Sequence, residues 1–139
     1  MAEGRALAAG MAEGVLIVLR EPLSFWGGMD PETGEVIDAH HPQRGEILTG
    51  RVVAMPSGRG SSSASSVLAE AIRIGKAPVA LVLMEPDPIV ALGSVVASEL
   101  YGSACPVVVL DEAAYERLRT GDSVRITADE RGARVEALA

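Results

Sequence analysis

The sequence predicts an α/β domain in which a mixed sheet carries flanking helices, and three observations support this. Short apolar runs alternate with helix-like segments through residues 48–119, the pattern of strands joined by helices. The chain has 139 residues, which fits one ordinary domain. Hydrophobic residues make up 48% of it against 22% charged, which is enough to form a core. We therefore expect one domain over residues 15–139, preceded by a flexible segment over residues 1–14.

The first third of the chain is expected to contain one strand and one long loop. Residues 1–14 are rich in alanine and broken by charged residues, which predicts a frayed start and not a secretion signal. The partly β-branched apolar run at residues 15–19 predicts a buried strand. Residues 23–45 carry four glycines and two prolines, so no long regular element is expected there. Phe25 and Trp26 in this loop predict either core anchors or a pocket wall.

Strands and helices are expected to alternate through the rest of the chain. Strands separated by helices favour parallel pairing. The helix that begins at Pro88 is apolar on nearly every side, so we expect it to be buried on more than one face, in part by a partner. The expected elements are strands at residues 48–55, 79–84 and 106–110, helices after residue 63, from 88 to about 99 and over 112–119, and a hairpin of residues 123–127 and 133–138.

Charge and cysteine content exclude several classes of function. The 19 acidic and 12 basic residues give a net charge of -7, which argues against nucleic-acid binding. Every apolar run is far shorter than the roughly 20 residues that cross a bilayer, so no membrane span and a cytoplasmic location are expected. Cys105 is the single cysteine, so this chain lacks the thiolates for an iron–sulfur cluster. His40 and His41 point to opposite sides of an extended chain, which does not favour a shared metal.

The turn GRGSSS at residues 58–63 is the densest candidate for chemistry. Its glycines allow close approach of the backbone, and the free N–H groups at the start of the following helix favour an anion. Arg59 adds a fixed positive charge that can hold a carboxylate or phosphate. The alternative is an ordinary helix cap, because serine is a favoured capping residue.

Nucleotide and hydrolase signatures fit this turn poorly. No phosphate-binding G-x-x-x-x-G-K motif is present, and the dinucleotide fingerprint lacks its third glycine. The G-x-S-x-G elbow is also missing, so a serine hydrolase would need to assemble Ser61, one of the two histidines and a distant acid. Asp87, next to Pro88, is expected to cap the second helix.

Four segments of the sequence, in this order, resemble the small subunit of aconitase X: LSFWGGMDPETGEVIDAHHPQRGE, GRVVAMPSGRGSSSASSVLAEAIRIGKAPVALVL, EPDPIVALGSVVASELYG and CPVVVL. The resemblance implies that residues 15–139 form the swivelling β/β/α domain of the aconitase superfamily. It also implies a large-subunit partner that holds the iron or iron–sulfur cluster, and dehydration of a small hydroxy acid.

The resemblance also implies roles for individual residues. Ser61 corresponds to the proton acceptor of the superfamily, with N–H groups around Gly60, Ser62 and Ser63 as donors to the anionic substrate. Gly27 and Gly28 are expected to line the substrate pocket. Aconitases carry an arginine two residues after the catalytic serine, where this chain has Ser63. Arg59 is therefore the candidate for substrate binding on this chain, with a partner residue as the alternative.

Two substrates fit the resemblance, cis-3-hydroxy-L-proline and mevalonate 5-phosphate. Alanine and arginine are plentiful and Lys76 is the one lysine, a composition typical of GC-rich bacterial genomes, so hydroxyproline is favoured. A function of another class also remains open, a non-catalytic module whose Gly/Ser turn binds an anion for a partner.

Overall fold

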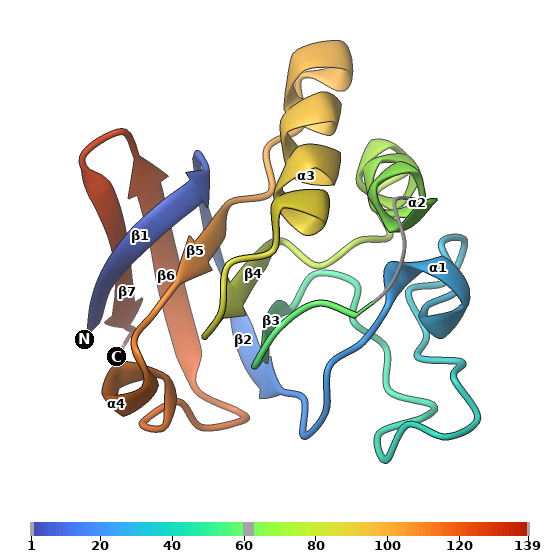
Figure 1. The fold of residues 1–139 in the computed structure, drawn as a ribbon, viewed down its shortest axis with the longest axis horizontal. Coiled ribbons are helices and arrows are strands. Elements are labelled where there is room, and N and C mark those ends of the chain that lie inside the picture. Colours follow the sequence, from blue (N-terminus) through green and yellow to red (C-terminus); the bar gives the residue numbers. More distant parts are fainter. Residues whose placement is uncertain (1, 60–62, 139) are drawn as a thin grey trace.

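The computed structural model describes residues 2–59 and 63–138, and within them seven strands close into a barrel. The strand order around the barrel is β1-β5-β4-β3-β2-β6-β7. Helices α2 and α3 lie together on one side of it, and the β6–β7 hairpin lies on the other (Figure 1). The element bounds are β1 Ala2–Ala8, β2 Gly10–Val18, α1 Phe25–Gly28, β3 Val52–Met55, α2 Ser63–Arg73, β4 Ala80–Leu83, α3 Pro88–Tyr101, β5 Val107–Val109, α4 Glu112–Tyr115, β6 Ser123–Asp129 and β7 Gly132–Ala137.

The predicted mixed sheet is confirmed. Strands β2, β3, β4 and β5 pair in parallel, because each crossover returns the chain to the same end of the sheet. The remaining pairs, β1 with β5 and β7 and β6 with β2 and β7, are antiparallel. The predicted C-terminal hairpin is β6–β7, with Asp129 opposite Gly132 at its turn.

Two cores lie on the two faces of the parallel strands. Side chains alternate along a strand, so Val53 and Met55 pack toward the helices while Val52 and Ala54 point into the barrel. The first core includes Leu68 of α2 and Val90 of α3 in addition to the buried residues of the long loop. The second is closed at one end of the barrel by Ala114 and Tyr115 of α4.

The prediction of a flexible segment over residues 1–14 is wrong for the described residues 2–14. They form β1 and most of β2, and β1 pairs on both edges, with β5 and β7. Alanine and glycine have low strand propensity, but pairing on both sides overrides it. Small residues also permit close packing here, since a Cβ on Gly14 would lie 2.9 Å from the Gly50 carbonyl oxygen.

Three further elements differ from prediction. Strand β3 begins at Val52 and not at residue 48, because Gly50 has a φ of 75° and the chain turns there. Helix α4 ends at Tyr115 instead of residue 119, and the following residues form turns. The long loop contains one short helical turn, α1, in which Gly27 has a φ of 80°.

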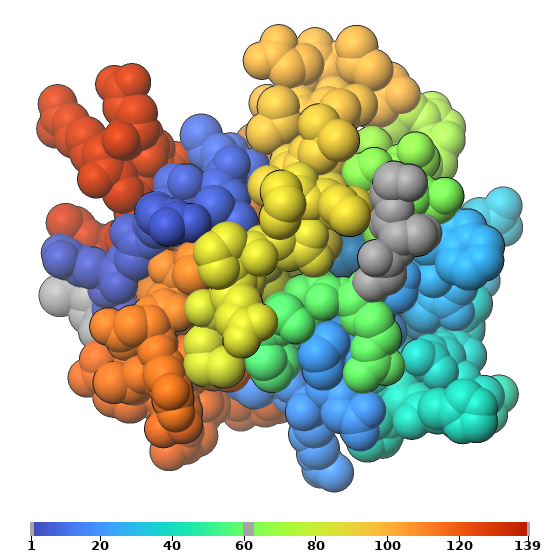
Figure 2. All heavy atoms as spheres, in the orientation of Figure 1, coloured from blue at the N-terminus to red at the C-terminus, as the bar shows by residue number. Residues whose placement is uncertain are grey.

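Within this chain helix α3 is buried on one face, and the expectation that a partner covers part of the rest stays a prediction. Its buried residues are Val90, Gly93, Ser94 and Ala97. Leu92 is 53% exposed and Leu100 68% exposed, and α3 stands uncovered at the surface in the space-filling view (Figure 2). No helix in the described part of the chain has the length and apolar character needed to cross a membrane.

Candidate functional site

The candidate site lies where the loops after β2 and β3 meet the start of α2. Parallel strands present their carboxyl ends at the same edge of a sheet, where ligands of α/β proteins commonly bind. Leu23 forms an isolated parallel bridge with Gly58, which holds the SFWGG loop against the GRGSSS turn. Helices α1 and α2 are in contact and lie side by side in Figure 1.

The predicted residues Gly60, Ser61 and Ser62 lie outside the described residues. Their neighbours on both sides are described. Arg59 precedes them, and Ser63 is the first residue of α2. The roles predicted for these three residues therefore stay predictions that rest on the resemblance.

Packing fixes the chain on either side of the turn. A Cβ on Gly58 would collide with the Asp87 carboxylate and lie 3.1 Å from Val90 Cγ2, so the backbone at Gly58 lies directly against the start of α3. A Cβ on Gly93 of α3 would lie 2.7 Å from the Ser65 carbonyl oxygen in the first turn of α2. Two glycines thus allow the backbone at residue 58 and the start of α2 to approach α3 closely.

The predicted capping role of Asp87 is confirmed. Its Oδ1 accepts hydrogen bonds from the backbone N–H groups of Ile89, at 2.9 Å, and Val90, at 3.2 Å. The first N–H groups of α3 are therefore satisfied within the chain. The described first turn of α2 likewise contains no acidic residue, and this 11-residue helix directs a partial positive charge toward its N-terminus.

Arg59 adds a second positive charge beside this helix terminus. Its Nη2 lies 3.9 Å from Glu21 Oε1, and the two side chains are 54% and 51% exposed. A pair this long and this hydrated is weak. A substrate carboxylate can therefore compete with Glu21 for the guanidinium, although a contact between Arg59 and substrate stays a prediction.

The two aromatic residues of the SFWGG loop have different environments. Phe25 is 1% exposed and belongs to the first core, whereas Trp26 is 60% exposed. Gly27 is exposed, and its positive φ of 80° explains why glycine stands there. Gly28 is buried, with its carbonyl accepting the N–H of Ile37 at 2.9 Å. Its structural role is clear, and contact of either glycine with substrate stays a prediction.

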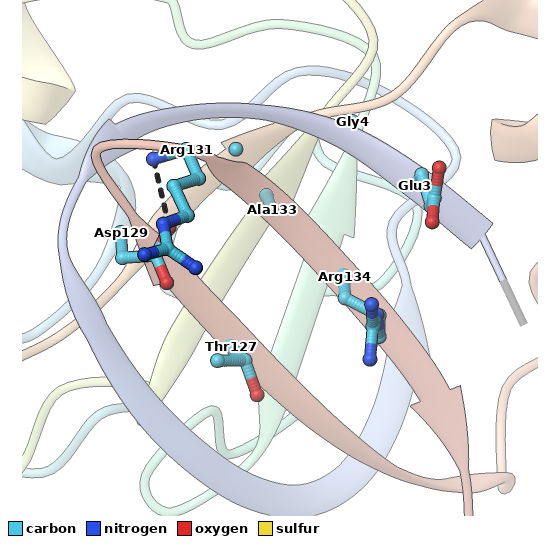
Figure 3. A pocket seen from close by; sticks show the side chains of 8 residues that line it. Glu3, Gly4, Thr127, Asp129, Arg131, Ala133 and Arg134 are labelled. Atoms are coloured by element: carbon cyan, nitrogen blue, oxygen red, sulfur yellow. Dashed lines mark hydrogen bonds between the residues drawn. The ribbon is translucent and has the colours of Figure 1, made fainter.

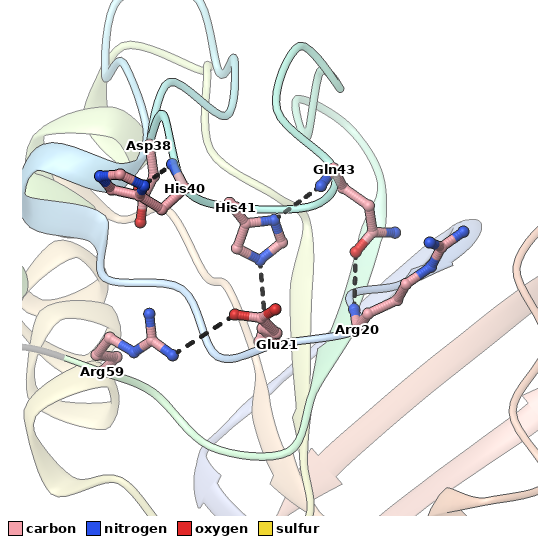
Figure 4. A network of polar contacts seen from close by, with 7 residues as sticks. All are labelled: Arg20, Glu21, Asp38, His40, His41, Gln43 and Arg59. Atoms are coloured by element: carbon pink, nitrogen blue, oxygen red, sulfur yellow. Dashed lines mark hydrogen bonds and ion pairs between the residues drawn. The ribbon is translucent and has the colours of Figure 1, made fainter.

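Hydrogen bonds within the chain hold the two histidines of the long loop in place (Figure 4). His41 is buried, and its Nδ1 accepts the N–H of Gln43 at 3.1 Å, which leaves Nε2 to donate to the Glu21 carbonyl at 3.1 Å. Both ring nitrogens are therefore occupied, so His41 is poorly placed to act as the base of a hydrolase. His40 is exposed, and its backbone N–H donates to Asp38 Oδ1.

The residues that the structure describes do not fit an iron site. In the parts that the structure describes, no three His, Cys, Asp or Glu side chains lie close enough together to hold a metal ion. Cys105 is buried, as predicted for a small hydrophobe, and its thiol donates to the Pro78 carbonyl at 3.5 Å. Burial raises the pKa of Cys105 to about 12, so the thiolate that iron requires is disfavoured there.

Comparison with known proteins gives one family match, the aconitase X swivel domain, over residues 1–135. The cis-3-hydroxy-L-proline dehydratase of Pseudomonas aeruginosa is 51% identical over 85% of this chain, but the match covers 21% of that protein. The phosphomevalonate dehydratase small subunit of Thermococcus gammatolerans is 42% identical over 91% of each chain.

The crystal structure of Thermococcus kodakaraensis aconitase X in its holo form has the same fold. It superposes with a TM-score of 0.86 at 40% identity, covering 99% of this chain and 98% of the other. The chain spans about a fifth of the length of the two cis-3-hydroxy-L-proline dehydratases that it matches, at 21% and 20%.

Proposed function

Because the chain belongs to the aconitase X swivel-domain family, we propose that it is the small-subunit part of a dehydratase that removes water from a small hydroxy acid. The observation that carries this proposal is the family match, which spans residues 1–135 and so includes both loops of the candidate site. The named relatives are dehydratases or small subunits of dehydratases.

Ser61 is the proposed base. It takes the proton from the carbon next to the substrate carboxylate, and the electron pair left there forms a double bond to the neighbouring carbon. The hydroxyl group of that carbon leaves as hydroxide, which forms water with the proton that Ser61 took. A serine hydroxyl is a weak base, and each pKa unit by which its alkoxide is favoured requires about 1.4 kcal/mol of differential stabilisation. The positive N-terminus of α2, which begins two residues later, and Arg59 both act in this direction.

The substrate carboxylate is proposed to bind the same positive region. N–H groups around Gly60 to Ser63 are the proposed hydrogen-bond donors. The substrate carboxylate is also proposed to displace Glu21 from the Arg59 guanidinium. The exposed Gly27 presents backbone without a side chain beside this region. Preorganised donors act more strongly where water is excluded. In this chain alone, however, the site is open to solvent at Arg59 and Trp26.

A large partner subunit is proposed to close the site and to hold the iron or iron–sulfur cluster that the family implies, since the residues described in this chain do not fit one. The uncovered apolar face of α3 is consistent with such a partner, because exposed apolar patches of this kind mark interaction surfaces. We therefore expect the chain to fold alone and to have no dehydratase activity alone.

The favoured substrate is cis-3-hydroxy-L-proline, which would give a pyrroline carboxylate. Identity supports this choice, at 51% with the Pseudomonas aeruginosa dehydratase against 42% with the Thermococcus gammatolerans small subunit. The alternative is mevalonate 5-phosphate, as the names of the archaeal small subunits suggest.

The test is to co-express the chain with a large-subunit partner, purify both together and assay the two acids separately. We expect the complex to dehydrate hydroxyproline and the chain alone to dehydrate neither acid. Turnover of mevalonate 5-phosphate alone would reverse the choice of substrate. Turnover of either acid by the isolated chain would refute the need for a partner.

A further inference from the structure

Three arginines gather in one hollow below the candidate site, although the chain as a whole is acidic. The hollow has a volume of about 710 Å³, and four segments converge on it: the end of β2, the loop of residues 42–46, the start of β3 and the loop before β6. Arg20, Arg44 and Arg51 line it, and Glu46 is the one carboxylate among the described lining residues.

The positive charge in the hollow is only partly balanced. Arg51 Nη1 lies 3.4 Å from Glu46 Oε2, and the Arg51 side chain is 26% exposed. The guanidinium groups of Arg20 and Arg44 have no ion pair with any described residue. Figure 4 shows the Arg20 guanidinium directed away from Glu21 and Arg59. Like charges held in one hollow repel, and a bound anion would remove that repulsion.

The polar groups of the hollow are mainly donors. The Gln43 side chain already makes hydrogen bonds within the chain. Its Oε1 accepts the backbone N–H of Arg20 at 2.7 Å, and its Nε2 donates to the Val18 carbonyl at 3.0 Å. Thr120 Oγ1 accepts the Val18 N–H at 3.0 Å, which leaves its hydroxyl hydrogen to donate. Three guanidinium forks and a hydroxyl against one carboxylate suit an oxyanion.

We propose that this hollow binds a dianion of the phosphate class. Three guanidinium groups and one carboxylate leave two positive charges, which matches a phosphate group near neutral pH. Planar guanidinium forks hold phosphate oxygens in pairs. Its volume also leaves room for an organic group attached to the phosphate.

A second hollow of the chain provides a matched control (Figure 3). It is formed by β1 and the β6–β7 hairpin, and Arg131 and Arg134 lie there with Glu3 and Asp129. Its charges therefore balance, and no preference for a dianion is expected. Replacing Arg134 changes the net charge of the protein by the same amount as replacing Arg44.

The test is a titration of the full chain with inorganic phosphate at constant ionic strength, followed by backbone amide NMR shifts. We expect saturable shifts around residues 42–46. Arg44→Gln should weaken binding about tenfold, whereas Arg44→Lys should retain part of the affinity and Arg134→Gln all of it. Acetate at the same ionic strength should give no saturable shift.

Several outcomes would overturn the proposal. They are shifts that do not saturate with phosphate, equal affinity for acetate, or equal weakening by Arg44→Gln and Arg134→Gln. A parallel titration with glycerol 3-phosphate identifies the source of the dianion. Tighter binding than inorganic phosphate supports a site for a phosphorylated small molecule, and equal binding supports a site for free phosphate.

Discussion

The contact between Gly93 of α3 and Ser65 of α2 predicts the cost of adding one methyl group. A Cβ at position 93 would lie 2.7 Å from the Ser65 carbonyl oxygen, 3.2 Å from its Cα and 3.3 Å from Leu68 Cβ. The two contacts with Ser65 are to backbone, so α2 must move away from α3. Such overpacking costs about 1–3 kcal/mol, while removing glycine from a helix interior returns about 0.5–1 kcal/mol.

We therefore expect Gly93→Ala to lower the free energy of unfolding by about 1–2 kcal/mol, or the Tm by about 3–7 °C for a domain of this size. Thermal unfolding followed by circular dichroism measures this. Ser98→Ala, at an exposed position of the same helix, is the control and should be neutral or slightly stabilising. A Gly93→Ala protein as stable as the parent would refute the close packing of α2 on α3.

Three other perturbations test the fold and the site that it holds. Asp87→Ala should cost about 1 kcal/mol in denaturant unfolding because α3 loses its cap, and Asp87→Asn should retain most of that stability. Phe25→Ala should cost about 3–5 kcal/mol, since the ring is fully buried beneath the SFWGG loop; a loss below 1 kcal/mol would contradict its role as an anchor. An unfolded thiol ionises near its ordinary pKa of about 8.5, whereas burial raises the pKa of Cys105 to about 12. The stability that this shift contributes is therefore complete below about pH 8.5 and is lost as the pH rises toward 12. Unfolding measured across that range should show a larger loss in the parent protein than in Cys105→Ala, which keeps only the smaller loss from Tyr115, whose pKa burial also raises to about 12.

The parallel half of the fold could be predicted because its signals are local. Val52 to Met55, Ala80 to Leu83 and Val107 to Val109 are continuous apolar runs, and stop signals such as Gly75 and Pro78 separate them from the helices. Asp87 before Pro88 is likewise a local capping signal. These segments lay within a few residues of their predicted bounds.

The N-terminal strand could not be predicted, because its stability comes from distant partners. Ala2–Ala8 pairs with β5 and β7, about a hundred residues or more away in the sequence. Nothing in an Ala/Gly-rich segment indicates such pairing, although charged Glu3 and Arg5 alternate with less exposed neighbours. The closure of the sheet into a barrel depends on this strand, so it was not predicted either.

The candidate site was predicted in part. The closeness of the SFWGG loop to the GRGSSS turn follows from the parallel pairing of β2 with β3, which the Leu23–Gly58 bridge extends. The different environments of Phe25 and Trp26 could not be predicted from adjacent positions in a loop. The hollow with Arg20, Arg44 and Arg51 was missed, since these residues are scattered and only the folded chain brings them together.

The most direct test of the account compares Ser61→Ala with Ser63→Ala in the purified complex with its large subunit. Dehydration of hydroxyproline and binding of substrate are measured separately for each variant. We predict that Ser61→Ala lowers kcat by at least about a hundredfold, as expected for loss of a general base, while assembly and substrate affinity are retained. Ser63→Ala keeps the backbone N–H that is the proposed donor and should keep most of its activity. Full turnover by the Ser61→Ala complex would contradict the account.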